Sequence, residues 1–191
     1  MLTINDLKNG QFIILEGSPF EVLSVRHSHL GRGGANVQAK LRDLRTGKVF
    51  DRNFKPADKF EEVEIEKIKT QFIYSHRDEF WFAEISNPKN RFSLPLGIIG
   101  DYKDFLKSNL EITALKFEDE IINIELPIKV DYKVIEAPPG IKGDTAQGGT
   151  KSAVIETGAK VLVPLFVKEG DIIKINTQTG EYVERVESGK E

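Results

Sequence analysis

Cysteine is absent from the 191 residues of this chain. Its absence excludes disulfide bonds, thiolate metal sites and a cysteine nucleophile. Long hydrophobic runs are absent too, since no apolar stretch approaches the ~20 residues that a membrane-spanning helix requires. The first residues lack the basic and apolar segments of a signal peptide. We therefore expect a cytoplasmic protein that does not contact a membrane.

Side chains that would support enzyme chemistry are also scarce. His27 and His29 flank one strand position and could face the same side, but no further metal ligands at matching depth accompany them. His76-Arg77-Asp78-Glu79 matches part of a kinase catalytic loop by letters only, and a hairpin turn between two strands explains it better. We predict a protein that is not an enzyme, with no catalytic residue, no metal site and no cofactor.

The most informative stretch covers residues 26–40, whose centre reads Leu30-Gly31-Arg32-Gly33-Gly34. Its glycines allow positive φ angles and a tight reversal of the chain. Residues 20–25 and 37–41 both have strand character, which predicts a β-hairpin with Arg32 at its apex. Seven residues of arm, at about 3.3 Å each, would carry this side chain roughly 23 Å from the hairpin base.

Positive charge is concentrated around the same hairpin. Residues 26–55 contain eight basic and two acidic residues, although the whole chain has a net charge of −3. A local basic strip on an acidic protein suggests a polyanionic partner. The alternative is that Lys and Arg occupy the solvent side of edge strands and discourage aggregation. The candidates for contacts to the backbone of such a polyanion are Arg26, Lys40, Arg42, Arg45 and Arg52.

Short strands separated by frequent turns predict an all-β protein of three small barrels. Residues 1–63 fit an SH3-like barrel, while residues 64–127 and 128–191 each have the size of a five-stranded OB-fold barrel. Phe80-Trp81-Phe82 is expected to form the aromatic core of one strand. The best helix candidate is residues 101–109, where apolar side chains recur at helical spacing.

A polar loop interrupts the third block at residues 143–151. It contains Gly143, Asp144, Thr145, Gly148 and Gly149, and it does not match a phosphate-binding Walker motif. Two interpretations remain open at this point. The loop is either a surface connection or a segment whose backbone amides and small hydroxyls contact a nucleic-acid backbone.

The following residues carry a family resemblance. Lys151, Ala153, Gly158, Val163-Pro164 and Gly170 are spaced as in the signature of bacterial elongation factor P, which this segment closely resembles. The loop residues Gly143-Asp144-Thr145 and Gly148-Gly149 are similar to the third-domain loop of that family. Leu30-Gly31-Arg32-Gly33-Gly34 is similar to its tip loop, so the resemblance extends over the whole chain.

This resemblance implies an L-shaped, tRNA-like monomer with an SH3-like (KOW-like) domain and two OB-fold domains, related to the archaeal and eukaryotic initiation factor five-A. Such a factor binds the 70S ribosome, through ribosomal RNA and ribosomal proteins, between the P and E sites. It promotes peptide-bond formation at consecutive prolines. The tip would reach toward the CCA end of the P-site peptidyl-tRNA, and residues 143–145 would lie near the E-site mRNA codon.

The tip departs from the family's common patterns. Many members carry a tip lysine that is extended by β-lysylation or a related modification. Others carry an arginine, and a subset of these is rhamnosylated, in the context Ser-Gly-Arg-Asn. Here Arg32 stands in Leu-Gly-Arg-Gly, so lysine-specific chemistry is excluded and Arg32 is either modified or bare. The main alternative function is a general single-stranded nucleic-acid binder. Net charges of −4 over residues 64–127 and −1 over residues 128–191 count against it.

Overall fold

The computed structural model of the protein describes residues 1–30, 33–139 and 149–189, with backbone only for residues 27–30 and 33–36. In these ranges the chain forms three antiparallel β-sheets, one helical turn, α1 (Leu96–Ile99), and one 3₁₀ turn, η1 (Gly100–Asp104). The predicted all-β class is confirmed. Across the same ranges, no helix has the length and the apolar character needed to cross a membrane.

The first sheet has the strand order β1-β6-β2-β3-β4-β5 and contains the predicted hairpin. Glu16 and Gly17, both with positive φ, form the two-residue turn between β2 and β3. Apolar residues of one face form the core, which includes Ile13, Val22 and Leu41. The strands are β1 (Leu2–Thr3), β2 (Phe12–Leu15), β3 (Ser18–Leu30), β4 (Gly33–Asp43), β5 (Val49–Phe54) and β6 (Lys59–Glu62).

The second sheet has the order β11-β10-β7-β8-β9. The predicted hairpin turn between His76 and Glu79 is confirmed, because Arg77 and Asp78 have φ angles of 48° and 64° and connect β7 to β8. The prediction of an aromatic core in β8 was wrong for Trp81: its neighbours are buried, whereas Trp81 is partly exposed. The strands are β7 (Glu66–His76), β8 (Glu79–Glu84), β9 (Arg91–Pro95), β10 (Glu111–Phe117) and β11 (Glu120–Glu125).

The helix predicted over residues 101–109 was wrong, because only the short turn η1 forms there. In an α-helix over these residues, the carbonyls of Asp104 and Phe105 would each accept a hydrogen bond from the backbone N–H four residues later. Instead, the Asp104 carbonyl accepts the Thr157 hydroxyl at 2.7 Å, and the Phe105 carbonyl accepts the Tyr132 hydroxyl at 2.7 Å. Partners that are remote in sequence therefore replace the helical hydrogen bonds.

The third sheet has the order β14-β13-β12-β15-β16, and its outermost strands β14 and β16 also contact each other. The two edges of the sheet therefore approach each other, as expected for a small barrel. The strand β14 spans Lys160–Pro164. The other strands are β12 (Lys129–Glu136), β13 (Thr150–Ile155), β15 (Ile172–Asn176) and β16 (Glu181–Glu187).

Each sheet lies within one of the predicted domains 1–63, 64–127 and 128–191. Packing nevertheless divides the chain into two compact units, one of Met1–Lys69 with Thr113–Glu125 and one of Thr70–Ile112 with Leu126–Glu191. The division cuts the second sheet because Leu44 packs in a cluster with Leu115, Phe117 and Ile122. The three domain boundaries therefore stay a prediction.

Candidate nucleic-acid interface

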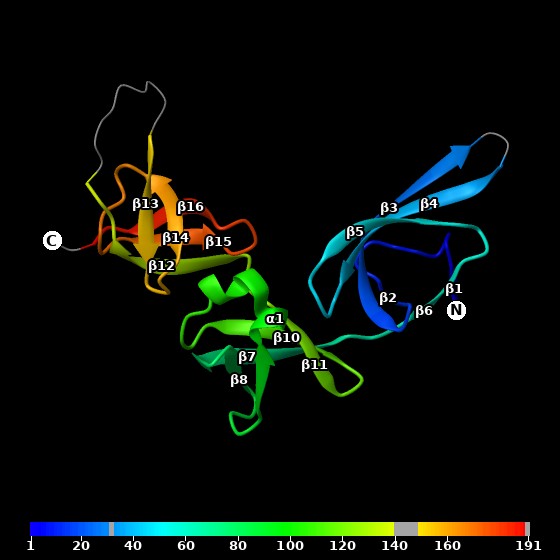
Figure 1. Cartoon of the computed structure of the whole chain (residues 1–191), viewed down its shortest axis with the longest axis horizontal. Coiled ribbons are helices and arrows are strands. Elements are labelled where there is room, and N and C mark those ends of the chain that lie inside the picture. Colours follow the sequence, from blue (N-terminus) through cyan, green and yellow to red (C-terminus); the bar gives the residue numbers. More distant parts are fainter. Residues whose placement is uncertain (31–32, 140–148, 190–191) are drawn as a thin grey trace. The chain divides into compact units, whose positions relative to one another are not determined.

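The predicted hairpin extends beyond the rest of its sheet (Figure 1). The edge strand β5 pairs with β4 only as far as the pair Val37 and Phe54. Beyond that point β3 and β4 pair with each other alone, as far as Leu30 and Gly33. The result is a two-stranded arm. The predicted tip residues Leu30, Gly33 and Gly34 lie at its strand ends, whereas Gly31 and Arg32 lie outside the described residues.

A β-bulge near Leu23 decides which side chains of the hairpin share a face. The register between β3 and β4 shifts between Val22 and Ser24, so that Ser24 lies opposite Lys40, and Arg26 opposite Gln38. Directly opposite residues lie on the same face of an antiparallel sheet. The polar side chains of β3 and β4 therefore gather on one face, away from the buried residues of β4.

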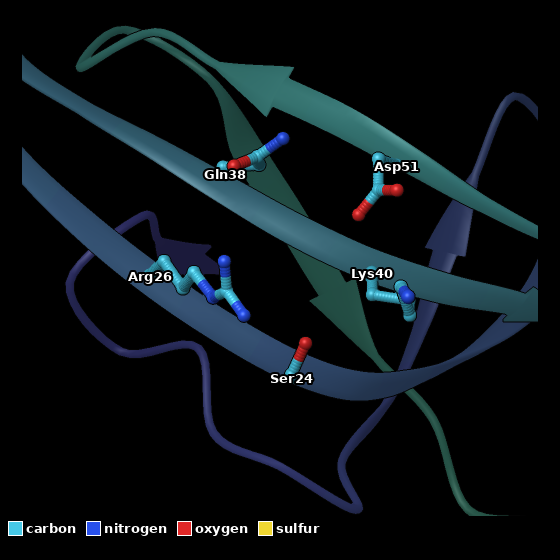
Figure 2. Close-up of a pocket in the computed structure, with 5 residues that line it drawn as sticks. All are labelled: Ser24, Arg26, Gln38, Lys40 and Asp51. Carbon is cyan, nitrogen blue, oxygen red and sulfur yellow. The ribbon is translucent and has the colours of Figure 1, made fainter.

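This polar face is hollowed next to the arm. Figure 2 shows the hollow, with Ser24 and Arg26 on β3, Gln38 and Lys40 on β4, and Asp51 on β5. Lys40 lies opposite Asp51 in the register of β4 and β5. Among the side chains that the structure describes, neither Arg26 nor Lys40 forms an ion pair. The hollow therefore presents two unpaired cations, a hydroxyl and an amide, which are all able to donate hydrogen bonds to a phosphate.

The other three predicted basic residues are already paired with carboxylates. Arg42 lies on the same face as Lys40, but Arg52 lies on the opposite face, in the row of Ala39. The three side chains are partly exposed, and such surface pairs contribute little stability. The pairs are Arg42 Nη1–Glu21 Oε2 at 3.3 Å, Arg45 Nη1–Glu120 Oε2 at 3.4 Å and Arg52 Nη2–Glu16 Oε1 at 2.6 Å.

The predicted third-domain loop is described only at its edges. Gly143, Asp144, Thr145 and Gly148 lie outside the described residues, and Gly149 lies just inside them. A Cβ atom at Gly149 would lie 3.1 Å from Leu165 Cδ1, so a larger residue here would require the Leu165 side chain to shift. On the far side of the loop, the Pro138 carbonyl accepts a hydrogen bond from Lys151 Nζ at 2.7 Å. This bond joins the two chain segments from which the loop extends.

Two further predictions concern metals. In the described ranges, no three His, Asp or Glu side chains come together in a way that could hold a metal ion. The side chains of His27 and His29 are not among those described, so their prediction is not tested.

The sequence and the structure were compared with known proteins. A family model described as "Elongation factor P (EF-P) KOW-like domain" matches residues 3–60, and one described as "Elongation factor P, C-terminal" matches residues 130–185. Elongation factor P from Moorella thermoacetica is 41% identical over 185 residues, which are 97% of this chain and 100% of the relative. The protein of the same name from Endomicrobium trichonymphae is 40% identical over 185 residues, with the same coverage of both chains.

Among solved structures, eukaryotic translation initiation factor 5A from Methanococcus jannaschii aligns with a TM-score of 0.43 and 20% sequence identity. The alignment covers 64% of this chain and 94% of the other.

Proposed function

We propose a specific role on the ribosome for this chain, which belongs to the elongation factor P family and is therefore a translation factor. It binds the 70S ribosome between the P and E sites, beside the P-site peptidyl-tRNA. There it promotes peptide-bond formation at consecutive prolines, where synthesis stalls. The single observation that carries this proposal is the two-stranded arm of β3 and β4, with unpaired cations at its base.

The arm has the shape needed to enter a confined, RNA-lined site. Among the described residues, no third strand pairs with it beyond Val37, and glycines flank Arg32 in the sequence. The guanidinium of Arg32 can pair with a phosphate or stack on a base of the CCA end. Holding that end in a productive geometry accelerates a reaction without any proton transfer from the protein. The tip therefore acts by positioning, and the protein needs no catalytic residue, metal or cofactor.

The hollow at the base of the arm is the candidate contact for the RNA backbone. Arg26 and Lys40 line it together with Asp51, and neither cation forms an ion pair among the described side chains. Contacts to phosphates orient a protein on RNA without reading its sequence. Arg42, on the same face, can exchange its partly exposed pairing with Glu21 for a phosphate.

The loop at residues 143–149 is the candidate contact for the E-site codon. Gly143, Asp144, Thr145, Gly148 and Gly149 supply backbone amides and one hydroxyl suited to a nucleic-acid backbone. The Lys151–Pro138 hydrogen bond holds the base of the loop. We further propose that the protein acts as a cytoplasmic monomer. Its Arg32 is either bare or modified, and the intact mass of the native protein distinguishes these two states.

The experiment is single-turnover Pro-Pro synthesis on stalled ribosomes at saturating factor, together with a ribosome-binding titration. For Arg32→Ala we expect a rate lower by about a hundredfold, as for small misplacements in other positioned reactions. Its binding should weaken by about 1 kcal/mol or less, because one exposed charge among many contacts is lost. Arg32→Lys should restore only part of the rate, because an ammonium lacks the planar fork of the guanidinium.

Two further variants complete this experiment. Arg52→Ala is the matched control, because it removes an arginine of the same sheet from the opposite face. Replacing Gly143, Asp144 and Thr145 together by alanine should weaken rescue while leaving the fold intact. A folded Arg32→Ala protein with the full rate at saturation would mean that the tip arginine is not the effector, and the role assigned to the arm would be withdrawn.

A further inference from the structure

The second sheet carries an aromatic pair on the face opposite its buried phenylalanines. Tyr74 of β7 lies directly opposite Trp81 of β8. Their rings are nearly parallel, with an interplanar angle of 15° and centroids 6.2 Å apart. Tyr74 is 47% exposed and Trp81 is partly exposed, whereas Phe80 and Phe82 on either side are buried. The two rings therefore present a flat aromatic surface to solvent.

A register shift creates this surface. The pairing between β7 and β8 is irregular between Phe72 and Tyr74, so that Phe72 faces the core and Tyr74, two residues later, faces solvent beside Trp81. Aromatic pairs across strands stabilise a sheet, and this pair contributes in that way too. Yet nearly half of Tyr74 stays in contact with water, and this exposed part does nothing for the fold.

An unpaired cation lies beside the rings. Ser93 of β9 lies opposite Trp81, and Arg91 lies one row further along, opposite Ala83. Diagonal neighbours on a sheet face are roughly 7–8 Å apart, within reach of long side chains. The Arg91 side chain is exposed and forms no ion pair or hydrogen bond with any of the described residues. A flat aromatic surface next to a free guanidinium suits a ring that is attached to a phosphate.

We propose that Tyr74 and Trp81 stack an unpaired base of RNA, while Arg91 contacts the adjoining phosphate. Base stacking on aromatic side chains tolerates any sequence, because every base has a π face. A guanidinium beside the rings favours a nucleotide over an apolar peptide. The net charge of −4 over residues 64–127 limits the contact to one or two nucleotides rather than a long strand. This contact would add to those of the arm and does not depend on Arg32.

Tryptophan fluorescence tests the proposal directly, since Trp81 is the only tryptophan of the chain. The full chain is titrated with hexaadenylate RNA up to millimolar concentration, and we expect saturable quenching. Tyr74→Leu removes the flat ring but keeps an apolar side chain in the sheet. Because stacking contributes about 1–3 kcal/mol per base, the dissociation constant of Tyr74→Leu for hexaadenylate RNA should be about fivefold or more above that of the unaltered chain. Thermal unfolding of the variant confirms that it is folded.

Three controls isolate the surface. Phe166→Ala removes an aromatic side chain of the third sheet that is 55% exposed, and it should leave the titration unchanged. Arg91→Gln should remove about one phosphate contact. The slope of log affinity against log salt concentration should therefore become shallower by roughly 0.7. Arg32→Ala should quench like the unaltered chain, so failure of this proposal and failure of the tip proposal are distinguishable. Absence of quenching, or equal affinity of Tyr74→Leu and Phe166→Ala, overturns the inference and leaves the pair a structural contact alone.

Discussion

The hollow at the base of the arm allows the sharpest test of the proposed RNA contact. The perturbation is to replace Arg26 and Lys40 by glutamine, singly and together. Both side chains are exposed and have no ion-pair partner among the described residues. Substitutions of this kind usually change the free energy of unfolding by about 0.5 kcal/mol or less. Any larger change in RNA binding can therefore be assigned to the lost contacts rather than to the fold.

The size of the effect follows from counterion release. Each phosphate contact contributes roughly 0.7–0.9 to the slope of log affinity against log salt concentration. If Arg26 and Lys40 each hold one phosphate, the double variant should lose about 1.4–1.8 of that slope. Between 50 and 200 mM salt, the unaltered chain should then lose roughly tenfold more affinity than the double variant does. Each single variant should show about half of the slope change.

The assay is fluorescence anisotropy of a labelled acceptor-stem RNA hairpin ending in CCA, measured at several salt concentrations. Arg52→Gln is the matched control, because Arg52 lies on the opposite face and pairs with Glu16 at 2.6 Å. Its slope should equal that of the unaltered chain. The reasoning is refuted if the double variant keeps the full slope, or if Arg52→Gln reduces the slope as much as Arg26→Gln does.

Two further predictions concern stability. Asn123→Ala should lower the free energy of unfolding by about 1–3 kcal/mol, measured by urea denaturation. The reason is that buried Asn123 donates a hydrogen bond to the Leu44 carbonyl at 2.9 Å and accepts one from the Ile124 N–H at 2.8 Å. An unchanged midpoint of urea unfolding would contradict this. Burial alone would raise the pKa of Asp171, but N–H donors from Lys168 and Gly189, with the Arg185 charge, hold it below its ordinary value. Its stabilisation is therefore complete above about pH 4 and is lost as the pH falls through the lowered pKa. Asp171→Asn should flatten that acid limb of unfolding, whereas the same change at exposed Asp101 should leave it unaltered.

Local chemistry in the sequence was sufficient to predict the turns and many of the strands. The turn after His76 is formed by Arg77 and Asp78, two charged residues that continue neither a helical nor a strand pattern in the sequence. The alternation of Val130, Tyr132 and Val134 is an equally clear strand signal for β12, although it was not among the predicted strands. Alternation also separates Trp81 from Phe80 and Phe82, so its solvent-facing position was available from the sequence. These signals are local, and tertiary packing did not override them.

The sequence by itself determined the all-β class, the hairpin of β3 and β4, and the excess of basic residues around it. Only the tertiary structure decided which of the described basic side chains pair with a carboxylate and which stay available for a phosphate. Arg45 and Arg52 find carboxylates 75 and 36 residues away in the chain, and the bulge near Leu23 places Arg26 beside Lys40. The missing helix has the same origin, because Tyr132 and Thr157 take its carbonyls. Interactions between residues so far apart depend on the folded geometry, and no pattern of neighbouring residues encodes them.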